Sequence, residues 1–470
     1  MGPHLVDGDT ARSLPSLPES LPEFWSRVRE FAVPTRMIET ATARRLRGDW
    51  AGACAAAGFD VDLDLRLLAR ARGRELAALV RADLRHLAPD LLRWHLPRIA
   101  PDGLLRPGLT ITLARYALPP DRPPLHLVVR TPPAWAAGGQ RVGLALWDGA
   151  DPTWDDPAGH PHPRPGRRFR LDLHRHLWDA RRAGELRERS GADRPPVPEA
   201  ERWAAETERW AAEARILLAA EGRTADAVAV RAGARRLVLD VGPDAYAIRA
   251  EAGAPGGRPD AHSVRTDGSV PGGRLPLLPD AATRPSPDLE LLRAGAVEPG
   301  RLHPLVAAAL APGAGPGVRA PDDPAAPRIV ECRGARHRIG LVDGVLAPLD
   351  HDPVQLRREE LLAALDGPPL PCLRAVDEAH RRPDCLDGVR DRILHGDVTG
   401  ALAAVEALLG PAAVLRDGPL RGALHGATAQ RLAYGLYRAG LAEPPPPRLL
   451  HEHPQHPYPR RTRRLPRRAL

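Results

Sequence analysis

The fold is decided within residues 327–367, which read PRIVECRGARHRIGLVDGVLAPLDHDPVQLRREELLAALDG. The first part of this stretch alternates runs rich in Val, Ile and Leu with two dipeptides, Gly334-Ala335 and Asp343-Gly344. Such dipeptides are typical of two-residue hairpin turns. The pattern therefore predicts an antiparallel meander of three strands over residues 328–350.

The two turns set the predicted pairing of the strands. With the first turn at Gly334-Ala335, Cys332 opposes His337, and with the second at Asp343-Gly344, His337 opposes Asp350. Side chains alternate between the two faces of a strand, so one face is expected to be buried. The residues expected on the buried face are Val330, Cys332, His337, Ile339, Leu341 and Leu346. The same register pairs Val330 with Ile339 and Leu341 with Leu346.

A helix is predicted directly after the meander. Asp352 suits the N-cap, Pro353 suits the first helical position, and Gln355 stands where a capping box places Glu or Gln. Gly367 fits the position just past the C-terminal end. The helix is expected to carry an apolar stripe of Leu356, Leu361, Leu362 and Leu365.

Composition indicates a globular protein with long irregular connections. A chain of 470 residues has room for about two or three domains, and 43% of its residues are hydrophobic. The 54 Pro and 43 Gly indicate extended unpacked segments. The net charge is +8, of which residues 448–470 supply +6 through seven Arg and Glu452. A general nucleic-acid-binding surface is therefore not indicated over the rest of the chain.

The four Cys have irregular spacing, which argues against a disulfide framework. Residues 1–20 have no basic segment followed by an apolar one, and no run of about 18 apolar residues occurs anywhere. We therefore expect a soluble cytoplasmic protein without a membrane span.

The order of the predicted elements indicates an α+β protein of two domains, each with an antiparallel sheet and packed helices. The N-terminal domain (21–192) follows a disordered leader (1–20) and has helices at 21–97, strands at 109–149 and an irregular insertion at 151–168. The C-terminal domain (198–442) has strands at 225–250 and 328–350, helices at 353–440 and a disordered loop at 251–287. A basic Pro/Arg-rich tail (443–470) completes the chain.

Two short similarities add local detail. The sequences GDWAGACAA (48–56) and GDVTGALAA (396–404) share six of nine positions and predict two helices that each begin at an Asp N-cap. No longer repeat period accompanies them. RWAAE occurs twice, seven residues apart, which places Trp203 and Trp210 on one side of a helix, where burial against the chain's own sheet is expected.

The row of Cys332, His337 and Asp350 is the candidate catalytic site. A thiol next to an imidazole that a carboxylate orients is the arrangement used in covalent acyl transfer. No known motif surrounds Cys332, and a small core Cys beside a hydrogen-bonded His–Asp pair explains the same pattern.

Metal binding is a second hypothesis. Cys332-x4-His337 and Cys372-x7-His380-x4-Cys385 supply sulfur and nitrogen donors, although neither spacing matches a known zinc module. If residues 171–177 form a strand, Asp172, His174 and His176 project from one face, with His160 and His162 in the preceding loop. Solvated or paired His residues explain these patterns equally well.

We predict a non-catalytic interaction or scaffold protein that requires no cofactor and binds other proteins, because no catalytic motif is strong. Residues 448–470 offer a contact for nucleic acid or an anionic surface. The alternative is a thiol-dependent enzyme using Cys332, His337 and Asp350, or a metal-binding enzyme.

Overall fold

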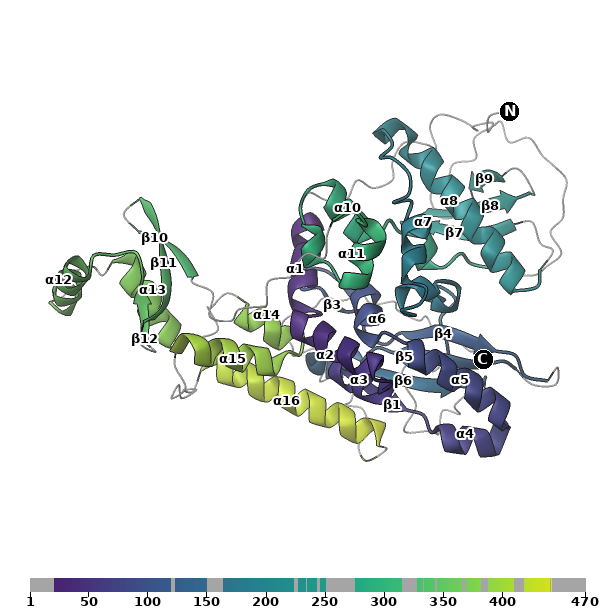
Figure 1. Cartoon of the computed structure of the whole chain (residues 1–470), viewed down its shortest axis with the longest axis horizontal. Helices are drawn as coiled ribbons and strands as arrows, with labels where there is room; N and C mark the ends of the chain where they lie inside the picture. The colour runs from purple at the N-terminus through teal and green to yellow at the C-terminus, as the bar shows by residue number, and fades with distance from the viewer. Residues whose placement is uncertain are drawn as a thin grey trace, which may run out of the picture.

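The computed structural model shows a mixed helical and β-sheet protein with several small sheets (Figure 1). It describes residues 21–119, 123–149, 164–223, 227–233, 235–242, 246–250, 275–314, 328–332, 334–342, 345–365, 368, 370–381, 388–409, 418–439 and 441. The predicted leader and basic tail lie outside these residues, as do most of the predicted insertion and the first part of the predicted loop at 251–287.

Short helices form the N-terminal layer, as the sequence predicted. Their amphipathic pattern buries one side of each helix, and all but the first helix pack on the core of a four-stranded sheet. The helices are α1 (Leu21–Phe31), α2 (Thr35–Leu46), α3 (Trp50–Ala56), α4 (Leu65–Arg72), α5 (Arg74–His86) and α6 (Pro89–His95).

The four-stranded sheet has the order β1-β6-β5-β4, from β1 (Phe59–Asp62), β4 (Thr110–Tyr116), β5 (Leu125–Arg130) and β6 (Val142–Trp147). Strands β4 to β6 confirm the predicted antiparallel strands. Strand β1 was missed, because it has only four residues and lies between two helices, and it pairs parallel with β6. A small hairpin of β2 (Arg98–Ile99) and β3 (Leu104–Leu105) precedes the sheet.

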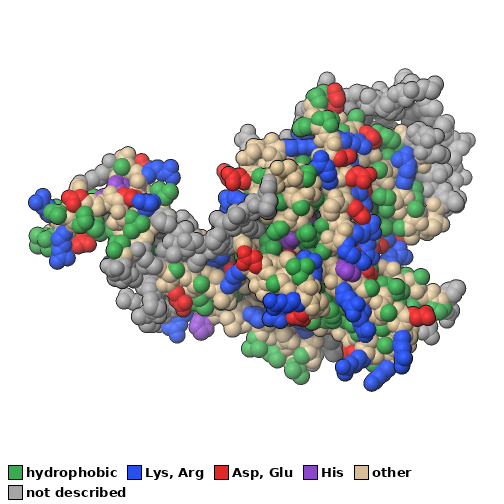
Figure 2. Space-filling model, viewed as in Figure 1, with side chains coloured by type: hydrophobic (Ala, Val, Ile, Leu, Met, Phe, Trp, Pro, Cys, Tyr) green, Lys and Arg blue, Asp and Glu red, His purple; other side chains and the backbone are tan. Residues whose placement is uncertain are grey.

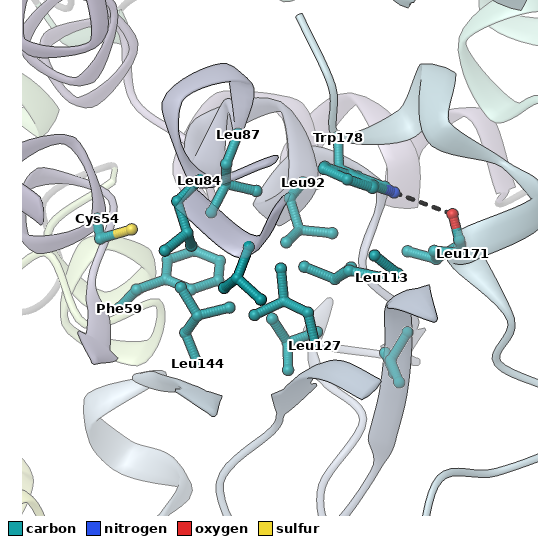
Figure 3. Packing of buried hydrophobic residues seen from close by; sticks show 14 of the residues in the cluster. Cys54, Phe59, Leu84, Leu87, Leu92, Leu113, Leu127, Leu144, Leu171 and Trp178 are labelled. Carbon is teal, nitrogen blue, oxygen red and sulfur yellow. Dashed lines mark hydrogen bonds between the residues drawn. The ribbon is translucent and has the colours of Figure 1, made fainter. Parts of the chain in front are cut away.

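The largest core lies between this sheet and helices α5 and α6 (Figure 3). Leu84, Leu113 and Leu127 are fully buried in it. Trp178 closes one end and donates a hydrogen bond from Nε1 to the carbonyl oxygen of Leu171 (2.9 Å), so its single polar group is satisfied.

The segment at 171–177 is not a strand. It forms two 3-10 turns, η2 (Leu171–Leu173) and η3 (Arg175–Leu177), which lead through η4 (Ala183–Glu185) into α7 (Leu186–Ser190). The apolar residues there anchor turns against the main core, and a run this short does not distinguish turns from a strand.

A second sheet packs on a long helix. The prediction that residues 225–250 and 328–350 share one antiparallel sheet was wrong, because these segments form separate three-stranded sheets. Strands β7 (Ala227–Ala232), β8 (Arg235–Val241) and β9 (Tyr246–Ala250) form an antiparallel meander beside α8 (Glu199–Ala220). Trp203 and Trp210 pack edge to face with 5.6 Å between ring centroids, and Trp210 is fully buried. The predicted burial of this pair against the chain's own sheet is confirmed.

Part of the predicted disordered loop is ordered. From residue 275 the chain returns to the second sheet, where the Ala229 amide donates to the carbonyl oxygen of Pro276 (2.8 Å). Helix α9 (Asp280–Thr283) follows, and Leu278 is buried beside β7, so apolar burial orders this end of the segment.

The division into two domains is not confirmed. Helices α10 (Pro287–Arg293) and α11 (Pro304–Leu310) pack against α1 and α6, across the predicted boundary. Arg29 of α1 forms a buried ion pair with Asp288 (2.7 Å), and the indole of Trp94 donates to the same carboxylate (3.0 Å). These contacts join the early and middle parts of the chain into one packed body.

The predicted meander is present as β10 (Arg328–Cys332), β11 (Ala335–Val342) and β12 (Val345–Pro348). The second hairpin has the predicted register, since Leu341 pairs with Leu346; its turn residues Asp343 and Gly344 lie outside the described residues. The first hairpin register was wrong by two residues. Gly334 takes the second turn position with a φ of +78°, so Cys332 pairs with Ala335 and Val330 with His337.

A shift of two residues leaves each side chain on its expected face. Cys332, Ile339 and Leu346 are buried, and Val330 and His337 are partly buried. The prediction of one buried face is therefore confirmed for these residues, while the side chain of Leu341 lies outside the description.

Helix α12 (Pro353–Ala364) begins as predicted, with the Asp352 carboxylate accepting the amide of Val354 (3.2 Å). Its predicted apolar stripe is mostly exposed, and only Leu356 is half-buried. Leu361, Leu362 and Leu365 are 56%, 55% and 80% exposed, because α12 lies at the outer end of the molecule. Gly367, the predicted end signal, lies outside the described residues.

The C-terminal helices are α13 (Pro371–Arg381), α14 (Val389–Leu394), α15 (Val398–Leu409) and α16 (Pro419–Arg438). Both predicted Asp caps are present: Asp49 accepts the amide of Gly52 (2.8 Å), and Asp397 accepts that of Gly400 (3.0 Å). A Cβ at either Gly would lie within about 2.2 Å of the capping carboxylate, which explains the shared GDxxG pattern.

Helix α16 runs beside α2 and α3, while β10 to β12, α12 and α13 form an outer lobe (residues 328–381) that projects from the body (Figure 1). No helix in the described part of the chain has the length and apolar character needed to cross a membrane.

Candidate metal centre

Two thiols and one imidazole meet inside the outer lobe. Cys332 is the last residue of β10, His351 follows β12, and Cys372 lies in the first turn of α13. One ligand atom from each lies within 4.8 Å of the other two. Among the described residues, this is the one group of three or more His, Cys, Asp and Glu side chains with such spacing.

Local packing brings the three residues together. Cys332 faces inward from its strand, and α13 packs against β10 so that Cys332, Leu370 and Cys372 form a small buried cluster. The second hairpin then returns the chain to the same end of the sheet, where His351 precedes the α12 cap. Each ligand therefore comes from a different element.

The imidazole of His351 is in direct contact with one thiol. Its Nε2 lies 3.3 Å from Sγ of Cys372. The ring of His337 stacks on that of His351, with 4.1 Å between centroids and 14° between planes. Nδ1 of His337 is buried and has no hydrogen-bond partner among the described residues, which is unusual for a buried ring nitrogen.

One thiol of the centre is held in its protonated form. Burial, and then the hydrogen bond with Cys332, raise the pKa of the Cys372 thiol to about 12. The nucleophilic form of Cys is the thiolate, so at neutral pH Cys372 is a poor nucleophile. A bound cation would reverse this preference, because a coordinating thiol is deprotonated.

The donor set and its spacing fit zinc. Zn–S bonds of about 2.3 Å and Zn–N bonds of about 2.0–2.1 Å in tetrahedral geometry place neighbouring ligand atoms roughly 3.5–3.8 Å apart. The separation of 3.3 Å between His351 and Cys372, and the 4.8 Å limit for all three atoms, require only small side-chain adjustments. Sulfur ligands favour zinc over magnesium or calcium.

The structure does not assemble the predicted row of Cys332, His337 and Asp350. Both carboxylate oxygens of Asp350 bind Arg338, whose backbone amide lies 2.7 Å from Oδ2 and whose Nη2 lies 2.7 Å from Oδ1. These hydrogen bonds hold the pKa of Asp350 at about 2. Asp350 is thus committed to Arg338, and His337 stacks on His351.

The second predicted group is also not assembled. Asp172 is bound by the guanidinium of Arg170 at 2.8 and 2.7 Å, and Nε2 of His174 lies 3.2 Å from Glu213. His176 is buried beside His174, with 5.8 Å between ring centroids. Asp172 is thus engaged by Arg170, and the three predicted donors do not form a metal-ligand cluster among the described residues.

The other predicted donors contribute nothing to the centre. His380 is exposed, and its Nδ1 lies 2.8 Å from the carbonyl oxygen of Val376. Cys385, His160 and His162 lie outside the described residues.

His351 is the ligand that the sequence analysis missed. Its sequence position offered one signal, a His between the last strand and the Asp352 cap, where a loop positions side chains on a rigid frame. Pairing it with Cys372 requires knowing that α13 folds back onto β10, which no local pattern shows.

Comparison with known proteins does not identify a relative of this chain. Neither protein-family profiles, nor curated proteins, nor solved structures match the chain.

Proposed function

We propose that the outer lobe is a zinc-binding unit in which Cys332, His351 and Cys372 ligate one ion. The observation that carries this proposal is the meeting of their three ligand atoms within 4.8 Å. Cys2His donor sets occur in both structural and catalytic zinc sites, which differ in whether a position stays open to substrate.

A structural role is the better supported of the two. Cys332 and Cys372 are fully buried, and the ring of His337 covers one side of His351, so access for a substrate is restricted. The ligands come from a strand, a turn and a helix, and a shared ion would hold these elements together. Reduced Cys ligands also suit the cytoplasmic location that we propose.

Metal analysis of the purified full chain tests this proposal. We expect about one equivalent of zinc in the wild type and loss of that zinc in Cys372→Ala. Cys54→Ala is the matched control, because Cys54 is equally buried but lies in the main core. Zinc absent from the wild type after growth and purification with added zinc, or retained in Cys372→Ala, would contradict the assignment.

We also propose that the chain is a non-catalytic interaction protein in which this lobe forms part of a second domain. Supporting this role, α12 exposes Leu361, Leu362 and Leu365, and exposed apolar clusters of this kind are typical of protein-binding surfaces. The partner class is a protein with a complementary apolar surface.

Affinity purification from the native cytoplasm tests the interaction role, using the wild type and the double variant Leu361→Ser, Leu362→Ser. A partner recovered with the wild type and lost with the variant is the expected result. An identical set of recovered proteins would exclude α12 as the contact. A variant that lacks residues 443–470, purified in the same way, shows whether the basic tail contributes to partner binding.

A further inference from the structure

A cavity of about 730 Å³ lies between the N-terminal layer and the C-terminal helices. Helices α2 and α3 form one wall, α15 and α16 form the opposite wall, and η1 (Ala134–Gly139) closes one end. Its volume is in the range of small-molecule sites, which span about 300–1,000 Å³. The cavity shares no residue with the metal centre.

The cavity wall is strongly cationic. It includes four guanidinium groups, those of Arg36, Arg93, Arg141 and Arg431, against the single carboxylate of Asp397. Arg36 pairs with Asp397, and Arg141 pairs with Asp60 just outside the wall (2.6 Å). Even with both carboxylates counted, an excess of two positive charges remains on Arg93 and Arg431.

Arg93 carries a buried charge without a counter-ion. Its side chain is 2% exposed, and it donates to the carbonyl oxygens of Ala32 (3.2 Å), Gln140 (2.6 Å) and His395 (3.4 Å). No described carboxylate pairs with it. A buried charge without a counter-ion is costly, so an anion close to Arg93 would be strongly favoured.

A glycine keeps the approach to Arg93 open. Gly58, with a φ of +77°, lies in the cavity wall, and a Cβ there would stand 3.4 Å from Nη1 of Arg93. Arg431 extends from α16 into the same wall and has no ion-pair partner among the described residues. His395, the remaining titratable group, stays neutral because burial, and then Arg98 and Arg93, lower its pKa to about 3.

The rest of the wall combines apolar side chains with the hydroxyl groups of Thr40, Thr399 and Thr428. Met37 and Ala56 lie on the N-terminal side, and Ala427, Leu432 and Leu436 lie on α16. Leu432 is 64% exposed although it borders a cavity, so its apolar surface is available to a ligand. A cationic end with an apolar body is complementary to a molecule that has one acidic group on a hydrocarbon chain.

We propose that this cavity binds a small amphipathic anion, with a carboxylate or phosphate group beside Arg93 and Arg431 and an apolar body against α2 and α16. The proposal is independent of the zinc site. In this proposal, Arg431 donates charge-assisted hydrogen bonds to the acidic group of the ligand from the exposed side. Arg93 supplies a second, buried positive charge.

Calorimetric titration of the full chain with decanoate, decyl phosphate and 1-decanol, all below their micelle-forming concentrations, tests the proposal. We expect one of the two anions or both to bind, and the uncharged alcohol to bind at least about tenfold more weakly, the loss expected for a charge-assisted contact. The tighter of the two anions identifies the acidic group. Absence of binding by both anions, or equal binding of 1-decanol, would overturn the proposal.

A matched pair of glycine variants on α16 locates the site. Gly435 lines the cavity and Gly422 does not, and a Cβ at either position meets no atom within 4 Å. The Cβ of Gly435→Leu therefore meets no neighbour, and its side chain adds bulk at the cavity wall, which should abolish anion binding, whereas Gly422→Leu should leave it unchanged. Both replace a helical Gly with a better helix former, so neither should lower the melting temperature.

A charge variant checks the headgroup contact. Arg431→Gln should weaken anion binding by about tenfold or more and leave 1-decanol unaffected. Arg81→Gln, on the exposed surface of α5 away from the cavity, is the control. Anion binding that survives both Gly435→Leu and Arg431→Gln would place the ligand elsewhere and overturn the assignment.

Discussion

The main core and the outer lobe are stabilised in different ways. The main core buries large side chains in a continuous cluster, among them Leu84, Leu113 and Leu127 (Figure 3). The outer lobe has a small cluster of Cys332, Leu370 and Cys372, a few residues packed on the C-terminal helices, and a helix whose leucines remain exposed. Hydrophobic and charged side chains mix at its outer end (Figure 2). A unit with so little apolar burial needs another source of stability, and a metal is one.

The largest expected effect is removal of zinc from the outer lobe. We expect a chelator to lower the opening free energy of β10 and α13 by on the order of 4 kcal/mol, the stabilisation given by a ligand at about a thousand times its Kd. Amide hydrogen exchange followed by mass spectrometry measures this region by region. Amide protection of β4 and β5 should not change. An equal loss of protection in β4 and β5 and in β10 and α13 would show that zinc does not stabilise the outer lobe specifically.

Truncation in the main core should be the next largest effect. Leu127→Ala removes a fully buried side chain and leaves a cavity, so we expect a loss of about 2–5 kcal/mol in unfolding free energy. Urea denaturation with tryptophan fluorescence measures it. A loss below about 1 kcal/mol would show that the core relaxes around the cavity.

A pH-dependent effect is expected where α8 meets the η2 turn. Hydrogen bonds from His174 and Arg189 outweigh burial and lower the pKa of Glu213 from 4.5 to about 2. Glu213 therefore stabilises the folded state above about pH 4.5, and this contribution is lost as the pH falls toward 2.

Glu213→Gln should cost roughly 3 kcal/mol at pH 7 and progressively less between pH 4.5 and 2. Thermal unfolding of the wild type and variant across this range gives the difference. A cost that does not depend on pH would show that the carboxylate charge has no role in stability.

The smallest expected effect is on the apolar side of α12. Leu362→Ser should change the unfolding free energy by no more than about 0.5 kcal/mol, because the side chain is more than half exposed. Leu346→Ser, in the buried face of the same lobe, should be destabilising by comparison. Equal losses in calorimetric scans would mean that α12 is covered by another surface.

The strands and helices follow from local patterns that the sequence displays. A short run rich in apolar and β-branched residues at 125–130 predicted β5, and Asp352-Pro353 predicted the start of α12. The first hairpin register could not be predicted, because a Gly at either position of a two-residue turn is acceptable. Gly334 takes the second position, and the shift preserves the buried face.

The candidate site was predictable only in part. Cys332 and His337 were correctly placed on one face of the meander, because that depends only on alternation along the strands. The partnership of Cys332 with Cys372 and His351 depends on how α13 packs, and packing between distant elements leaves no mark in a single sequence. The exposure of α12 has the same cause: an apolar stripe predicts a contact and does not identify what covers it.

Zinc K-edge X-ray absorption of the full chain with one equivalent of zinc tests the central claim most directly. The zinc-binding assignment predicts two sulfur ligands at about 2.3 Å and at least one imidazole nitrogen at about 2.0–2.1 Å. A spectrum with oxygen and nitrogen ligands alone would contradict it.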